Sequence, residues 1–243
     1  MLPRYPTAPG WYRPVLLARW LFLKAVVASG RGDRMAFRGV ELMNQAASPL
    51  TGSAVPERLV AEHGDGYAMA DTLNRYVWTL PHLDGRRVVD LGCGSGYGAH
   101  VVSWVADGVT GLDFSPEAIA YAKAHYPGVD FRVADLTRGD ALPPGDVGLC
   151  FEVLEHLPDP DRAMRAAFAA YPRVFISVPN PWWHNSQLNP HHVNDFPLRE
   201  WRRRLHAAGA TSVKLSVQAV GDPRVVPGWR PRASSWVLDC SRS

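Results

Sequence analysis

The sequence has few cysteines, and none of them is placed as a disulfide framework or a zinc site requires. Its 243 residues include only three, an odd number spread across the chain: Cys93, Cys150 and Cys240. Close or paired spacings are typical of secreted disulfide scaffolds and of zinc-binding motifs. Their absence favours a reducing compartment, and we expect a cytoplasmic protein.

Long uninterrupted apolar runs are also absent. Residues 13–28 are apolar but contain Arg19 and Lys24, so this run is too short and too interrupted to span a bilayer or to act as a signal peptide. We expect a helix here that packs on the rest of the chain or on the second subunit of a homodimer. The alternative, membrane contact through an interfacial helix with Trp20 and Phe22 among lipid headgroups, is less favoured.

Charge of one sign is not in large excess. The chain has 26 Lys and Arg against 23 Asp and Glu, a net charge of +3. The arginines concentrate in residues 4–38 and 199–232, without a basic stripe or a recognition-helix pattern, so nucleic acid is not an expected partner. The hydrophobic content of 47% is sufficient for a sizeable core.

Strand and helix patterns alternate from residue 66 onward. Helical spacing or capping signals predict helices at 66–80, 97–106, 116–126, 160–170 and 198–208. Apolar runs predict strands at 86–91, 108–113, 129–134, 146–151, 173–178, 211–220 and 234–240. This order predicts an α/β, Rossmann-like, doubly wound fold with a mostly parallel seven-stranded sheet. The last two strands have no helix between them, so they should form an antiparallel C-terminal hairpin at the sheet edge. Residues 1–80 are expected to be a helical extension or lid, and 81–243 the main domain.

The residues around which this fold is organised are 88–98, a buried strand followed by a turn with four alternating glycines and a helix. Glycine lets the backbone approach a ligand and adopt positive φ. A dinucleotide-binding turn places glycine where this chain has Tyr97. Asp90, two residues before Gly92, would attract a cation and repel a phosphate. The turn thus favours a positively charged ligand.

Four successive strands end in an acid. These residues are Asp90, Asp113, Asp135 and Glu152. In an open α/β sheet, ligands bind at the carboxyl ends of the strands, where the strand order reverses. Asp113 follows the glycine turn by about twenty residues, where a carboxylate can accept hydrogen bonds from both hydroxyls of a ribose.

These features resemble class I S-adenosylmethionine-dependent methyltransferases across residues 72–220. The resemblance implies S-adenosyl-L-methionine as cofactor, with Asp135 and the backbone of Leu136 at the adenine edge and Glu152 near the methionine part. Phe114 could cover one face of the adenine. The cofactor-binding residues implied or predicted are Asp90, Gly92, Gly94, Gly96, Asp113, Phe114, Asp135, Leu136 and Glu152. Residues 81–243 would then be the methyltransferase domain.

The loop 189–196 is similar to that of the bacterial subgroup of ubiquinone-type and natural-product or sugar O-methyltransferases. That subgroup commonly has Asn-Pro-aromatic-His-Val-Arg-Glu-Phe-Ser/Thr. This chain keeps His192 but has His191 for the aromatic residue, Asn194 for the arginine, Asp195 for the glutamate and Pro197 for the Ser/Thr. We therefore predict methyl transfer to a small-molecule acceptor, with oxygen preferred over nitrogen or carbon.

His156 and His192 are the candidate catalytic bases, since histidine exchanges protons near neutral pH. Each could instead make a structural hydrogen bond. Glu152, Glu155 and His156 could bind a divalent cation, but we predict no metal, because an oxygen-rich metal site needs more carboxylates near the substrate. Trp182 and Trp183 could line an aromatic or sugar acceptor or simply pack.

Two other functions remain open. One is an NAD(P)-dependent oxidoreductase, which Tyr97, Asp90 and the absence of a Tyr-x-x-x-Lys pair disfavour. The other is a non-catalytic protein that binds S-adenosylmethionine and has lost turnover.

Overall fold

The computed structural model describes residues 66–139, 141–182, 191–219, 222–230 and 232–242. The expectations for residues 1–65, among them the apolar run 13–28, lie outside the described residues, as does Trp183. No helix in the described ranges has the length and apolar character needed to cross a membrane. The three cysteines are free and buried, so the expected absence of a disulfide is confirmed.

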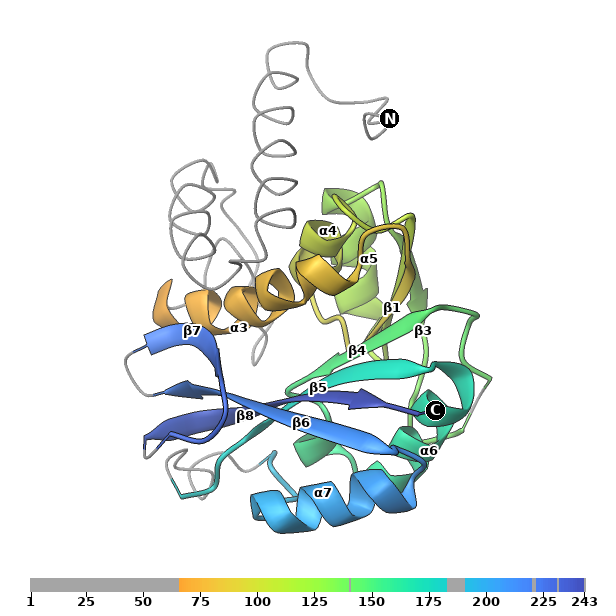
Figure 1. Cartoon of the computed structure of the whole chain (residues 1–243). Coiled ribbons are helices and arrows are strands. Elements are labelled where there is room, and N and C mark those ends of the chain that lie inside the picture. The colour runs from red at the N-terminus through yellow and green to blue at the C-terminus, as the bar shows by residue number, and fades with distance from the viewer. Residues whose placement is uncertain (1–65, 140, 183–190, 220–221, 231, 243) are drawn as a thin grey trace.

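Eight strands form one sheet (Figure 1). They are β1 (Arg87–Leu91), β2 (Gly108–Asp113), β3 (Asp130–Val133), β4 (Val147–Phe151), β5 (Arg173–Pro179), β6 (Ser212–Ala219), β7 (Asp222–Pro227) and β8 (Ala233–Ser241). The order is β3-β2-β1-β4-β5-β8-β6-β7. The first five strands pair in parallel, whereas β8 pairs antiparallel with β5 and β6. The doubly wound, mostly parallel fold is confirmed.

The C-terminal strands differ from the predicted hairpin in one respect. β6 and β8 do pair antiparallel, but an additional strand, β7, pairs with the other side of β6 and occupies the sheet edge. β7 carries Pro223 and Pro227, whose missing N–H groups suit an edge strand. No strand was predicted for this segment, because its prolines and glycines are typical of loops, so the sheet of the described residues has eight strands rather than the predicted seven.

The helices cover both faces of the sheet (Figure 1). They are α3 (Gly66–Thr79), α4 (Tyr97–Val102), α5 (Pro116–His125), α6 (Pro160–Ala170) and α7 (Leu198–Ala207). Side chains of α3, α4 and α5 share one buried cluster, and those of α6 and α7 share the other. Ser115 caps α5 by accepting from the Ala118 N–H, and Asp159 caps α6 by accepting from the Arg162 N–H.

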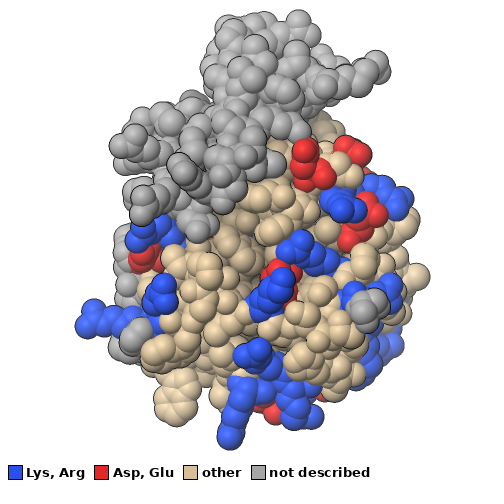
Figure 2. Space-filling view, viewed as in Figure 1, with Lys and Arg blue, Asp and Glu red and all other residues tan. Residues whose placement is uncertain are grey.

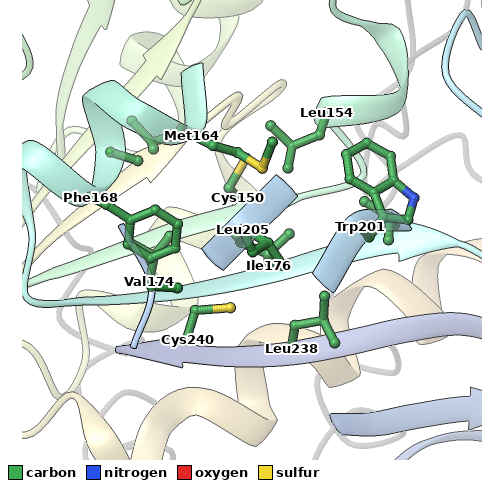
Figure 3. Packing of buried hydrophobic residues seen from close by; sticks show 14 of the residues in the cluster. Cys150, Leu154, Met164, Phe168, Val174, Ile176, Trp201, Leu205, Leu238 and Cys240 are labelled. Atoms are coloured by element: carbon green, nitrogen blue, oxygen red, sulfur yellow. The ribbon is translucent and has the colours of Figure 1, made fainter. Parts of the chain in front are cut away.

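The core beneath α6 and α7 is shown in Figure 3. Met164 and Phe168 of α6 and Trp201 and Leu205 of α7 pack above apolar side chains of the central strands. Trp201 is 1% exposed, so α7 covers the sheet closely at this residue.

The strand order identifies the edge of the sheet where a ligand would bind. This order reverses between β1 and β4. Their carboxyl ends form the topological switch point, where α/β folds bind ligands.

Candidate active site

The glycine turn after β1 has the backbone that the sequence predicted. Gly92 and Gly94 have φ of 80° and 55°. A Cβ at Gly92 would lie 2.4 Å from Cγ2 of Val153, so the turn and the segment after β4 are in close contact. A Cβ at Gly94 would meet no atom within 4 Å. The turn therefore packs tightly on one side and is open at Gly94, where a ligand can approach the backbone.

Asp113 points toward this turn. Its Oδ2 accepts a hydrogen bond from the Gly94 N–H at 2.9 Å, and its Oδ1 accepts one from the Ser115 N–H at 3.0 Å. These bonds fix the carboxylate at the end of β2, and carboxylate oxygens are acceptors for hydroxyl groups. The adjacent Phe114 is 69% exposed, which is unusual for a phenylalanine and suits an aromatic platform beside a ribose site.

Asp135 follows β3 and is held by its own loop. Its Oδ1 accepts from the N–H and the hydroxyl of Thr137 at 2.9 and 2.6 Å, and its Oδ2 lies 3.1 Å from Nε of Arg138. The Thr137 hydrogen bonds, with Arg138, lower the pKa of this carboxyl. A cavity of about 240 Å³ opens beside it, lined among others by Ala134, Leu136 and Ala163. This volume suits a ring-sized part of a ligand rather than a whole one.

Asp90 lies below the surface of the site. It is 0% exposed, and the Tyr76 hydroxyl donates to its carboxylate oxygens at 3.1 and 3.3 Å. Burial, together with the negative charge of Asp113, raises its pKa to about 7, although the Tyr76 hydrogen bond opposes this shift. Asp90 is thus a buried group at the base of the turn, and direct contact with a cofactor stays a prediction.

Glu152 follows β4 in an unusual backbone conformation. Its φ of 54° is the only positive value for a residue other than glycine in the described ranges. Its N–H donates to the carbonyl oxygen and Oγ of Ser177, each at 3.1 Å, and the Ser177 hydroxyl donates to Oε1 at 2.8 Å. Nη1 of Arg75 lies 3.5 Å from the same oxygen. Such strain is concentrated at functional sites, where surrounding contacts hold it.

The sequence analysis did not identify Arg75 and Tyr76 as site residues. Both lie on α3, and both are buried, at 4% and 4% exposure. Each contacts one of the acids at the strand ends, Glu152 and Asp90 respectively. The only sequence signal for Arg75 was its place beside the apolar positions of a predicted helix. A buried arginine needs a partner, and the local sequence does not show which residue that partner is.

His156 and His192 lie close together, and Glu155 lies beside His156. Glu155 and His156 belong to the short 3-10 helix Leu154–His156, and His192 belongs to the segment after β5. The histidine ring centroids are 4.8 Å apart, and Nε2 of His156 lies 3.9 Å from Oε1 of Glu155. One donor atom from each of the three residues lies within 4.8 Å of the others.

Glu155 is the most unusual member of this cluster. Both of its carboxylate oxygens are buried and make no hydrogen bond within the described residues. Burial, and then the negative charge of Glu152, raises its pKa well above the ordinary value. The cluster can therefore exchange protons between a carboxyl and two imidazoles, or share a divalent cation.

Asn194 links the loop that contains His192 to the segment after β4. The Asn194 side-chain amide donates to the carbonyl oxygens of Leu154 and Leu157 at 3.3 and 2.5 Å. The backbone N–H groups of Val193 and Asn194 both donate to the Glu155 carbonyl at 2.9 and 3.1 Å. Asn194 thus ties the loop after β5 to the segment after β4, at the position where the resembling subgroup has an arginine. Trp182, which follows β5, is 81% exposed.

Comparisons with known proteins identify the family of this chain. A sequence model described as a methyltransferase domain matches residues 61–215. A probable S-adenosylmethionine-dependent methyltransferase of Mycolicibacterium smegmatis is 36% identical over 135 residues, which cover 51% of this chain and 52% of that protein. The ubiquinone biosynthesis O-methyltransferase of Thiobacillus denitrificans is 37% identical over 121 residues, which cover 47% and 50%. The chain spans about half the length of the curated relatives it matches.

Solved structures show the same fold. The magnesium protoporphyrin IX methyltransferase of Synechocystis PCC 6803 with bound S-adenosylmethionine has a TM-score of 0.55 at 19% identity, covering 73% of this chain and 81% of that chain. A methyltransferase from Thermotoga maritima has a TM-score of 0.57 at 16% identity, covering 73% and 95%. The family match covers more than half of this sequence and confirms the resemblance: the chain belongs to the methyltransferase-domain family of S-adenosylmethionine-dependent enzymes.

Proposed function

We propose that the protein transfers a methyl group from S-adenosylmethionine to a hydroxyl oxygen of a small molecule. When bound, the donor supplies a methyl group on a sulfonium whose leaving group is neutral, so no acid is needed to release it. The protein's contribution is then to position donor and acceptor in line and to remove the hydroxyl proton.

The donor side fits the residues at the strand ends. The order β3-β2-β1-β4 places Asp135, Asp113, the glycine turn and Glu152 in one row along the carboxyl edge. We assign Asp113 to the ribose hydroxyls, the exposed Phe114 to one face of the adenine, and Asp135 with Leu136 to its edge. Glu152, at the other end of the row, would face the methionine part, where a carboxylate stabilises an ammonium.

The observation that carries the acceptor assignment is the cluster of Glu155, His156 and His192. A neutral hydroxyl is a weak nucleophile and needs a base to take its proton as it attacks, whereas a neutral amine is nucleophilic enough to attack before it loses a proton. We assign the removal of this proton to one of the two histidines. The Oε1 atom of Glu155 lies 3.9 Å from Nε2 of His156, so the protonated imidazole that results would favour the ionised form of this carboxyl. The names of the ubiquinone biosynthesis O-methyltransferases among the relatives support oxygen as the acceptor atom. Natural products, sugars and quinone-like phenols are the proposed acceptor classes.

The test is a transfer assay with methyl-labelled donor and a matched panel of a catechol, a sugar, an aromatic amine and a thiol. We expect label on oxygen, located by mass spectrometry. H156Q or H192Q should lower kcat roughly a hundredfold, because the base that assists the attack is lost. Titration calorimetry should show that both variants still bind S-adenosylhomocysteine.

The matched control is H206Q. His206 lies on α7, where its Nδ1 is 2.7 Å from the Ala210 carbonyl oxygen, away from the site. This variant should keep the wild-type rate. Label on the amine alone, or full activity in both H156Q and H192Q, would contradict the proposal. Binding of NAD without binding of S-adenosylhomocysteine would restore the oxidoreductase alternative.

A further inference from the structure

Arg75 is a buried cation with partners on three other elements. Its Nε donates to Oε1 of Gln218 on β6 at 2.5 Å, and its Nη2 donates to Oγ of Ser235 on β8 at 3.2 Å. Its Nη1 pairs with Oε1 of Glu152 at 3.5 Å. Gln218 in turn donates to the Asp71 carbonyl oxygen on α3 at 2.8 Å, which closes the network. A buried charge is costly unless it is paired, so this network constrains where the guanidinium can lie.

Glu152 is the member of this network that reaches the site. Its side chain is 24% exposed, whereas that of Arg75 is 5% exposed. Ser177 and Arg75 both contact Oε1, whereas Oε2 has no hydrogen bond or ion pair with the residues that the structure describes. Arg75 and Ser177 therefore fix the Glu152 carboxylate through Oε1, and the partly exposed side chain lies at the carboxyl edge of the sheet.

The backbone at Glu152 is coupled to the glycine turn. The next residue, Val153, has its Cγ2 atom 2.4 Å from the position that a Cβ on Gly92 would take. A change in the positive φ of Glu152 would therefore shift a side chain that packs against the turn. The contacts that hold Glu152 therefore also maintain the spacing between the two backbone segments on either side of the switch point.

We propose that Arg75 is a positioning residue of the donor site. From α3 it fixes the Glu152 carboxylate and its strained backbone so that Oε2 meets the ammonium group of the methionine part of S-adenosylmethionine. Arg75 itself does not touch the donor. This inference rests on the donor assigned above and is independent of the acceptor.

The first experiment measures S-adenosylhomocysteine binding by titration calorimetry for R75M, R75K and a matched control, R173M. Arg173 also forms an ion pair between elements, with Asp239 at 2.8 Å, but it lies at the amino end of β5. We expect R75M to weaken binding about tenfold, R75K to recover part of the loss, and R173M to stay within about twofold. In turnover, R75M should raise KM for the donor more than it lowers kcat.

The second experiment is a double-mutant cycle. If Arg75 acts through Glu152, R75M should weaken binding much less in an E152Q background than in the wild type. Unchanged affinity in R75M, or full additivity in the cycle, would overturn the proposal and leave Arg75 as a tie between α3 and the C-terminal strands. If R75M does not fold, S177A removes the other Oε1 contact, and unchanged affinity there would overturn it equally. Failure of the wild-type protein to bind S-adenosylhomocysteine would instead refute the donor assignment.

Discussion

Acidic residues that follow the parallel strands have opposite electrostatic environments. Asp90 is buried beneath Tyr76, and burial raises its pKa to about 7. Asp135 is partly exposed and accepts three hydrogen bonds, two from Thr137 and one from Arg138, and these lower its pKa. The sequence places both residues correctly at strand ends, but it does not distinguish a solvated carboxylate from a buried one. Because their pKa values are shifted in opposite directions, the two carboxyls should affect the stability of the protein at different pH values.

We predict that D90N stabilises the protein at high pH. The folded chain holds the Asp90 proton more tightly than the unfolded chain, where the ordinary pKa is 3.8. The stability provided by this proton is present below about pH 4 and is lost as the pH rises through about 7. Removing the buried charge should therefore raise the free energy of unfolding at pH 8 by on the order of 1–3 kcal/mol. Urea denaturation at pH 4.5 and 8 measures this, and most of the gain should be absent at pH 4.5.

The control for this experiment is D146N. The Asp146 carboxylate accepts a hydrogen bond from the Arg87 N–H at 2.8 Å, which lowers its pKa. The stabilisation by this carboxylate is present above the pKa that Asp146 has in the unfolded chain, and it is lost as the pH falls through its pKa in the folded chain. D146N should therefore lower the free energy of unfolding at pH 8. Equal gains for D90N at both pH values would contradict a buried, proton-holding Asp90.

We predict that G92A is more damaging than G85A. Both glycines have positive φ, of 80° and 70°, so alanine costs roughly 1 kcal/mol of backbone strain at either position. Only at Gly92 would the new Cβ meet Val153, at 2.4 Å, whereas Gly85 has open space. The overlap should cost about 1–3 kcal/mol more. Thermal unfolding and S-adenosylhomocysteine binding measure the two effects, and V153A should relieve G92A but not G85A.

At the scale of elements, local sequence patterns predicted most of the described helices and strands. They failed where a structure depends on contacts between residues far apart in the sequence. Buried apolar runs gave the parallel strands, and Ser115 with Pro116 gave the start of α5. β7 was missed because Pro223 and Pro227 are read as loop residues, although an edge strand tolerates them. The Arg75–Gln218 contact joins residues 143 apart in sequence, and no local signal specifies such a pair.

Helix capping offers a test at this scale. Asp159 caps α6 by accepting a hydrogen bond from the Arg162 N–H at 3.1 Å. D159A should lower the free energy of unfolding by about 1 kcal/mol, because this N–H loses its acceptor. D159N keeps an acceptor and loses only the charge near the helix N-terminus, so it should cost less. Urea denaturation compares the two, and an equal loss in both variants would show that the charge rather than the hydrogen bond matters.

Over the whole molecule, α3 belongs to the core of the sheet domain. Leu73, Tyr76 and Val77 are each at most 5% exposed and share a buried cluster with α4, α5 and the sheet. The Tyr76 ring also fills the space beside Gly98, where a Cβ would lie 2.1 Å from it. In the view of Figure 2 acidic and basic side chains lie together in small groups, and basic side chains gather at the lower edge. The sequence-based boundary after residue 80 would separate this helix from the surface on which it packs.

We predict that a chain shortened to begin at Gly66 folds and binds S-adenosylhomocysteine, whereas one that begins at Pro81 does neither. The longer chain keeps α3, with its apolar residues and its contacts to Asp90 and Glu152. The shorter chain exposes the apolar face that α3 covers and loses the partners of both acids, at a cost of roughly 2 kcal/mol for each large side chain no longer buried. Circular dichroism and titration calorimetry measure both properties. Wild-type affinity in the chain that begins at Pro81 would show that α3 belongs to the extension and that the donor site is complete without it.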